Sequence, residues 1–184
     1  MELKRISKYL SYILRHHPEE AGIELDKNGL AQTIGIIAAI SKRNPIDIEI
    51  LEEIVNTDKK GRYSFNEDMT KIRANQGHSI NVDVELQRIV PPDELYHGTA
   101  EEFVESIQDQ GLLPQGRLYV HLSKDISTAL EVGKRHGKAI VYVIDTKQMH
   151  NDDYEFYLSK NGVFLTKEVP KEYLKVQDDI TKEI

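Results

Sequence analysis

The sequence predicts an α+β protein with two units that divide near Pro91-Pro92. Before these prolines, apolar residues recur at the three- and four-residue spacing of amphipathic helices, and a short hairpin follows. After them, short apolar runs rich in β-branched residues alternate with short helical segments. A chain of 184 residues is long enough for two small domains. We therefore expect units at residues 1–90 and 91–184.

Three helices and a two-stranded hairpin are expected in the first unit. The first helix has an apolar face from Leu3 to Leu14 and stops before Pro18, and a turn follows at Asp26–Gly29. The other elements are helices at 31–42 and 47–56, with Ile34, Ile37 and Ile40 and then Ile50, Leu51, Ile54 and Val55 as their buried stripes, and strands at 62–65 and 71–73. This order is typical of the winged-helix fold, a common nucleic-acid-binding module.

Strands alternate with short helices in the second unit. A strand at 95–97 is expected to end on Gly98-Thr99, and the next helix is expected to close at Gly111 in a left-handed stop. Ser123 is expected to cap a helix that runs to about His136. The remaining expected elements are the helix at 100–110 and strands at 119–122, 139–145, 154–158, 162–165 and 173–176.

Composition excludes several classes of site. Because the chain has no cysteine, it has no disulfide, thiolate metal site or cysteine nucleophile. Its seven histidines lack the spacing of a zinc site, so we expect no metal. No apolar run approaches the ~18 residues of a membrane span, and the N-terminus is amphipathic from the start. We therefore expect a cytoplasmic protein with no membrane partner.

Charge is divided unevenly along the chain. Residues 1–90 carry 13 Lys/Arg against 14 Asp/Glu, whereas residues 91–184 carry 11 against 17. The net charge of -7 argues against general affinity for nucleic acid. The first half is therefore the better candidate for meeting a polyanion, through a few placed arginines rather than a basic surface.

The stretch from Ile72 to Ser79 follows no packing pattern. After Ile72 it has neither strand alternation nor a helical stripe, but it contains an arginine, two carboxamides, a glycine, an imidazole and a hydroxyl. These groups donate and accept hydrogen bonds, and Gly77 lets the backbone come close to a ligand. The guanidinium of Arg73 matches phosphate oxygens two at a time. The stretch therefore predicts an anion-binding segment.

Six short blocks occur in order between Ile6 and Leu174. They are Leu14-Arg15-His16 with Pro18, Ile72 to Ser79, Leu95 to Thr99, Val120 to Ser123, Gly133 to Gly137 and Asn161 to Thr166. In this order they resemble the RNA 2′-phosphotransferase family, whose enzymes use NAD to remove a 2′-phosphate from RNA. Leu30 and Phe164 stand where the family pattern has tryptophan, which affects local packing rather than the chemistry.

The resemblance implies a winged-helix lobe that receives RNA and an ADP-ribosyltransferase-like split-sheet lobe that holds NAD. An internal RNA 2′-phosphate would attack NAD, and the products would be RNA with a 2′-hydroxyl, nicotinamide and ADP-ribose 1″,2″-cyclic phosphate. The implied catalytic residues are Arg15, His16, Arg73 and Arg135. The implied NAD-binding residues are His97, Gly98, Thr99, His121 and Ser123, and the implied contacts to the phosphate or RNA are Asn75, Gln76, His78 and Ser79.

The chemistry of these residue types agrees with the resemblance. A phosphate is already anionic, so it needs orientation and charge compensation rather than a general base, and arginines supply both. The motif blocks offer no evident glutamate base, which protein-modifying ADP-ribosyltransferases commonly use. His16 could move a proton at the ribose hydroxyls or hydrogen-bond the phosphate, and the sequence does not choose between these roles.

Other readings of the same residues remain open at this point. An NAD-dependent ADP-ribosyltransferase could act on another nucleic-acid phosphate and stop there, and a winged-helix protein could bind without catalysis. Taken singly, Arg15 and Arg135 suit helix ends, Arg73 suits an edge strand, and Ser123 suits a helix cap. The presence of all four tetrad residues favours the RNA 2′-phosphotransferase, because a binding module needs neither the His97 block nor Arg135.

Overall fold

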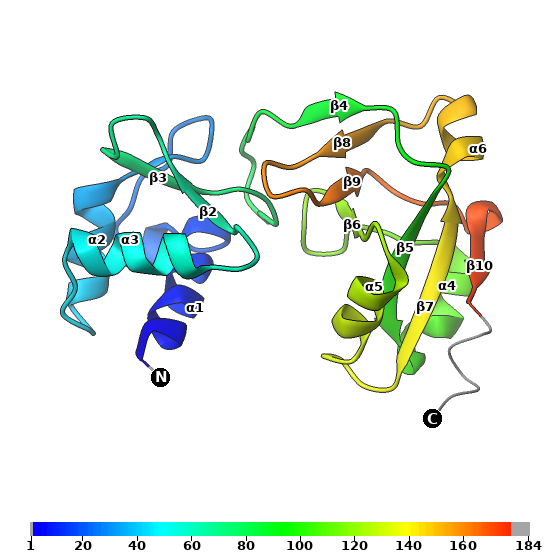
Figure 1. Ribbon diagram of the computed structural model, residues 1–184, viewed down its shortest axis with the longest axis horizontal. Coiled ribbons are helices and arrows are strands. Elements are labelled where there is room, and N and C mark those ends of the chain that lie inside the picture. Colours follow the sequence, from blue (N-terminus) through cyan, green and yellow to red (C-terminus); the bar gives the residue numbers. More distant parts are fainter. Residues whose placement is uncertain (1, 178–184) are drawn as a thin grey trace. The chain divides into compact units, whose positions relative to one another are not determined.

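The computed structural model describes residues 2–177 and consists of two compact units that divide between Leu86 and Gln87 (Figure 1). Each unit combines helices with antiparallel β-sheet. The predicted α+β class is therefore confirmed. Each unit has its own hydrophobic core and is described by itself.

The first unit has three α-helices and one small sheet. Its sheet has the strand order β1-β3-β2, and both pairings are antiparallel. Its elements are α1 (Glu2–Arg15), a 3-10 helix (Glu19–Ala21), β1 (Ala31–Gln32), α2 (Thr33–Ser41), α3 (Ile48–Thr57), β2 (Tyr63–Phe65) and β3 (Lys71–Ala74). The predicted hairpin of β2 and β3 and the predicted turn before β1 are confirmed.

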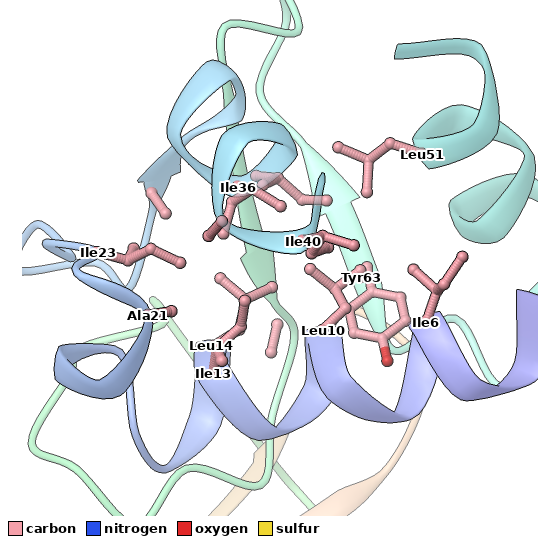
Figure 2. Packing of buried hydrophobic residues seen from close by; sticks show 14 of the residues in the cluster. Ile6, Leu10, Ile13, Leu14, Ala21, Ile23, Ile36, Ile40, Leu51 and Tyr63 are labelled. Atoms are coloured by element: carbon pink, nitrogen blue, oxygen red, sulfur yellow. The ribbon is translucent and has the colours of Figure 1, made fainter. Parts of the chain in front are cut away.

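The core of the first unit lies between α1 and the elements that pack on it. The apolar face of α1 meets Ile36 and Ile40 of α2 and Leu51 of α3 (Figure 2). Tyr63 of β2 is buried in the same cluster, and its hydroxyl donates a 2.6 Å hydrogen bond to the backbone oxygen of Ser7. This bond ties the sheet to α1.

The second helix differs from its prediction in its start and in its buried face. Ala31 and Gln32 form β1 instead of a helical turn, because they pair with β3. Ile34 was expected in the core but is 77% exposed, whereas Ile36 is fully buried. Almost every residue of α2 is apolar, so the sequence offers no polar contrast that identifies its outer face. Pairing of β1 with β3 decides the face instead.

The second unit contains two antiparallel sheets with helices packed on them. Their strand orders are β10-β7-β5 and β4-β8-β9-β6. The elements are β4 (Gln87–Ile89), β5 (Glu94–Ala100), a 3-10 helix (Glu101–Phe103), α4 (Val104–Gln110), β6 (Val120–Leu122), α5 (Ile126–Gly133), β7 (Ala139–Asp145), α6 (Thr146–Asn151), β8 (Phe156–Leu158), β9 (Phe164–Thr166), a second 3-10 helix (Lys171–Tyr173) and β10 (Leu174–Val176).

The strand β4 and the helix α6 were not anticipated from the sequence. β4 has only three residues and no alternation of apolar and polar side chains, yet it pairs with β8 from Gln87 opposite Leu158 to Ile89 opposite Phe156. This pairing attaches residues 87–89 to the second unit, ahead of Pro91-Pro92. The short helix α6 is capped by Asp145, whose carboxylate accepts a hydrogen bond from the backbone N–H of Gln148.

The predicted cap at Ser123 and the predicted end of the following helix near His136 are wrong. Asp125 caps α5, because its Oδ1 accepts a 2.7 Å hydrogen bond from the backbone N–H of Thr128, and the helix ends at Gly133. Ser123 lies before the cap and pairs with Tyr96 of β5 in an isolated antiparallel bridge. Asp125, two residues after Ser123, thus accepts the hydrogen bond from the first turn of the helix that Ser123 was expected to accept.

Gly98 is not at a strand end, as predicted, but in the middle of β5, opposite Val141 of β7. A Cβ atom at this position would lie 1.6 Å from the backbone oxygen of Ala129 in α5. A Cβ at Gly133 would lie 2.7 Å from the backbone oxygen of Thr99. The two glycines therefore let the backbones of α5 and β5 touch, and the space beside Gly98 that was expected to admit a ligand is filled by the helix.

We expect Gly98→Ala to destabilise the protein by about 3 kcal/mol or more, because a backbone carbonyl of α5 cannot move aside as a flexible side chain would. Urea unfolding of the variant and the wild type measures the loss. Gly116→Ala is the matched control, since a Cβ there would meet nothing within 4 Å. Equal stability of the two variants would contradict the packing argument.

Candidate functional site

Two arginines and two histidines of the first unit gather where α1 ends beside β3. Arg15 is the last residue of α1 and His16 follows it, while Arg73 lies in β3. The segment after β3 returns to α1, because the backbone N–H of Ser79 donates a 3.1 Å hydrogen bond to the backbone oxygen of Arg15. Nδ1 of His16 lies 2.9 Å from Oγ of Ser79. The charges of Arg15, His16 and Arg73 all act on the ring of His78.

His78 is 2% exposed and lies among these cationic groups. Burial, with a smaller contribution from the charges of Arg15, His16 and Arg73, lowers its pKa to about 4. The imidazole is therefore neutral at physiological pH. Its Nε2 is buried and makes no hydrogen bond within residues 2–177. A neutral ring here adds no further positive charge to the group.

Gly77 has a backbone conformation that favours glycine. Its φ of +88° is rarely adopted by residues with a side chain. A Cβ atom there would lie 3.5 Å from Cζ of Arg15. The glycine thus brings the backbone of the segment close to the guanidinium plane of Arg15, so the close approach is to a side chain of the same unit.

The four predicted contacts to phosphate or RNA differ in their exposure. Ser79 is exposed and Gln76 is half-buried, whereas His78 and Asn75 are buried. Asn75 is 5% exposed, and its amide accepts from Oγ of Ser64 and donates to the backbone oxygen of Gly61, both at 2.7 Å. Asn75 therefore ties the end of β3 to the start of β2, and its amide faces the fold.

Arg73 has an acidic partner that the sequence analysis did not identify. Its Nη1 lies 3.0 Å from Oε2 of Glu85 and 3.4 Å from the backbone oxygen of Asn28. Glu85 is twelve residues away in the sequence and outside every motif block, so no local pattern pointed to it. Only the fold brings this carboxylate to the guanidinium.

The predicted NAD-binding residues lie where the two sheets of the second unit meet. Tyr96 and Ser123 exchange two backbone hydrogen bonds, of 2.8 and 2.7 Å, and so join β5 to the segment after β6. Next to this bridge, Nδ1 of His97 donates a 3.0 Å hydrogen bond to the backbone oxygen of His121. This bond places the proton of the neutral ring on Nδ1 and the lone pair on Nε2. Burial lowers the pKa of His97, which favours the neutral ring.

Arg117, which the sequence did not point to, lies beside His121. Nη1 of Arg117 is 3.3 Å from Nδ1 of His121.

The remaining predicted residues of the second unit lie at α5. Thr99 is buried under this helix. Arg135 is exposed in the turn after it, where its backbone N–H donates a hydrogen bond to the backbone oxygen of Val132. The structure thus places the predicted residues in two sets, one in each unit.

The sequence pattern that defines the family "RNA 2′-phosphotransferase, Tpt1/KptA family" matches residues 1–168. The chain belongs to this family. A "Probable RNA 2′-phosphotransferase" of Fusobacterium nucleatum is 53% identical over 173 residues, which cover 93% of this chain and 97% of that protein. Proteins with the same name from Nostoc punctiforme and Flavobacterium johnsoniae are 50% and 47% identical, over 94% of this chain and 96% and 95% of their own lengths.

Family membership confirms the resemblance on which the sequence analysis relied, and it identifies a transferase that acts on RNA phosphate. Within the part of the chain that the structure describes, no helix has the length and apolar character of a membrane span. The same residues contain no cluster of three or more His, Cys, Asp or Glu side chains that could hold a metal ion.

The buried, neutral His78 predicts a pH dependence of stability. Between pH 6.5 and about 4 the unfolded chain binds a proton at this histidine that the folded chain does not, so the free energy of unfolding falls as the pH falls through this window. The expected contribution is roughly 3 kcal/mol at full protonation of the unfolded chain. Urea unfolding at several pH values measures it.

The matched variants for this experiment are His78→Leu and His136→Gln. His78→Leu should flatten the loss of stability between pH 6.5 and 4, because the titrating group is gone. His136 is exposed in the second unit, so His136→Gln should keep the wild-type profile. An unchanged slope in His78→Leu would contradict the assignment to His78.

Proposed function

We propose that the protein is an NAD-dependent RNA 2′-phosphotransferase, which transfers an internal RNA 2′-phosphate to NAD. The products are RNA with a 2′-hydroxyl, nicotinamide and ADP-ribose 1″,2″-cyclic phosphate. The observation that carries this proposal is the group of Arg15, His16 and Arg73 around neutral His78, in a chain of the RNA 2′-phosphotransferase family. Such a concentration of donors suits a phosphate better than any neutral substrate. With RNA as the substrate, we place the reaction in the cytoplasm.

The arrangement of each unit supports its proposed fold and partner. Three helices and the β2-β3 hairpin support a winged-helix lobe in the first unit, to which we assign the RNA. Two antiparallel sheets that meet at the bridge of Tyr96 and Ser123 support an ADP-ribosyltransferase-like split sheet in the second unit, to which we assign NAD. His97, His121 and Ser123 stand at this bridge, and Gly98 and Thr99 hold β5 against α5.

In the first step, an oxygen of the RNA 2′-phosphate attacks the anomeric carbon of the nicotinamide ribose. The bond from that carbon to the nicotinamide nitrogen breaks, and nicotinamide leaves as a neutral molecule. Because the phosphate is anionic, it needs no base to become a nucleophile. Arg15 and Arg73 orient it and offset its charge.

In the second step, the neighbouring ribose 2″-hydroxyl attacks phosphorus and the bond from phosphorus to the RNA 2′-oxygen breaks. The proton lost by the 2″-hydroxyl balances the one that the departing RNA oxygen gains. His16 is the group we assign to these hydroxyls, either as proton carrier or as hydrogen-bond donor to the phosphate. Arg135 supplies a further guanidinium, as arginines stabilise charge on a phosphoryl group in the transition state.

The direct test is to incubate the protein with NAD and an oligoribonucleotide that carries one internal 2′-phosphate. We expect loss of the phosphate from the RNA together with release of nicotinamide, and neither with the same oligonucleotide lacking the 2′-phosphate. Phosphate loss without NAD would refute the proposal. Accumulation of ADP-ribosylated RNA by the wild type would favour a transferase that stops after the first step.

Replacing Arg73 by alanine should slow resolution of the ADP-ribosylated phosphate by orders of magnitude, because charge on the phosphoryl group in the second step loses its partner. Gel analysis of the RNA should show the intermediate. Arg88→Ala is the control, since Arg88 is an exposed strand residue paired with Glu155 and such pairs contribute little. Wild-type turnover in Arg73→Ala would remove this residue from the chemistry.

Replacing His16 by alanine should lower kcat far more than it weakens NAD binding, because the imidazole is assigned to the reacting hydroxyls and phosphate. Single-turnover rates and the KM for NAD separate the two effects. The pH profile of the single-turnover rate distinguishes proton transfer from hydrogen bonding, since only the former adds a titration that disappears in the variant. A loss confined to KM would contradict the assignment.

A further inference from the structure

We infer that Glu85 is the resident counter-ion of Arg73, and that the RNA 2′-phosphate displaces it on binding. The inference rests on the proposed function, because it takes Arg73 as a phosphate-binding residue. It adds a residue that sets how tightly the phosphate is held, and this residue lies outside the motif blocks. Its evidence is the geometry of one ion pair and of the segment that delivers the carboxylate.

The two partners of the pair are unequally exposed. The side chain of Arg73 is 14% exposed, whereas that of Glu85 is 63% exposed. The guanidinium of Arg73 has a second contact within the fold, since its Nη1 also lies 3.4 Å from the backbone oxygen of Asn28. The exposed carboxylate can therefore rotate into water at little cost, while the arginine stays in place for an incoming anion.

The backbone at Glu85 is fixed in an uncommon conformation that presents the carboxylate. Its φ is +58°, in the left-handed region that a residue with a side chain seldom adopts. Its N–H donates a 2.9 Å hydrogen bond to Oδ1 of Asp83, and the N–H of Asp83 donates 2.8 Å to the backbone oxygen of Lys27. Because the backbone is anchored next to the turn that carries Asn28, side-chain rotation alone can release Arg73.

A phosphomonoester is a stronger partner for this guanidinium than the carboxylate. It carries up to two negative charges and three acceptor oxygens, and it can bind the guanidinium fork through two of them. The carboxylate of Glu85 must leave Arg73 before any anion can bind there. The ion pair therefore weakens binding of the phosphate by the same factor in the ground state and in the transition state. Its removal should therefore lower Kd and KM and leave kcat unchanged.

The experiment measures the Kd of an oligoribonucleotide with one internal 2′-phosphate, without NAD, for the wild type, Glu85→Gln and Glu24→Gln. Glu24 is an exposed residue of the same unit, so Glu24→Gln removes the same charge away from Arg73. We expect about three- to fivefold tighter binding for Glu85→Gln, as suits an exposed pair, and no change for Glu24→Gln. Glu85→Ala should tighten binding in the same way.

A double-mutant cycle with Arg73→Ala locates the effect. In the Arg73→Ala background, Glu85→Gln should no longer tighten binding, because the guanidinium that both anions share is absent. Thermal unfolding of each variant shows that it is folded. Steady-state assays with NAD should show a lower KM for the RNA and a wild-type kcat in Glu85→Gln.

Three outcomes would overturn the inference. Weaker binding or a lower kcat in Glu85→Gln would mean that the carboxylate orients Arg73 for catalysis. Equal tightening in Glu24→Gln would mean that net charge alone acts, and persistence of the effect in Arg73→Ala would place it elsewhere. A wild type that binds the oligonucleotide but consumes no NAD would instead overturn the proposed function, while the binding comparison still tests the counter-ion exchange.

Discussion

The first unit depends on one electrostatic constraint, which is that two guanidinium groups and an imidazole are held close to one another. Like charges in a partly buried place repel one another. The fold meets this constraint by burying His78 as a neutral ring among them and by pairing Arg73 with Glu85. The return of the Asn75–Ser79 segment to the end of α1 holds the group in register. The group is thus held in place by the fold and partly neutralised.

The second unit meets a packing constraint of a different kind. The backbones of α5 and β5 touch at Gly98 and Gly133, which fixes the helix against the strand without intervening side chains. Next to this contact, β5 carries His97, whose tautomer is set by the carbonyl of His121. The contact of Gly98 with α5 therefore holds the part of β5 that carries His97. Polar groups that are held in place in this way need little rearrangement to bind a ligand.

Much of the secondary structure could be predicted from the sequence, as could the gathering of Arg15, His16 and Arg73 near one another, and the failures have physical causes. The face of α1 and the hairpin were predictable because their apolar residues contrast with polar neighbours. β7 was predictable because it is a run of apolar and β-branched residues. Ile34 was misplaced because α2 is apolar nearly all round, and β4 was missed because pairing with β8, not local pattern, makes it a strand. Glu85 was missed because only the fold brings it to Arg73. Arg117 was missed because it lies outside the motif blocks, although it is only four residues from His121.

The bridge between Tyr96 and Ser123 has a consequence for sequence divergence. Both of its hydrogen bonds use backbone atoms, so the junction of the two sheets tolerates many side chains at these positions as far as the fold is concerned. Proline is the exception, since each residue contributes its own N–H. This junction can therefore persist while the residues at positions 96 and 123 change during evolution.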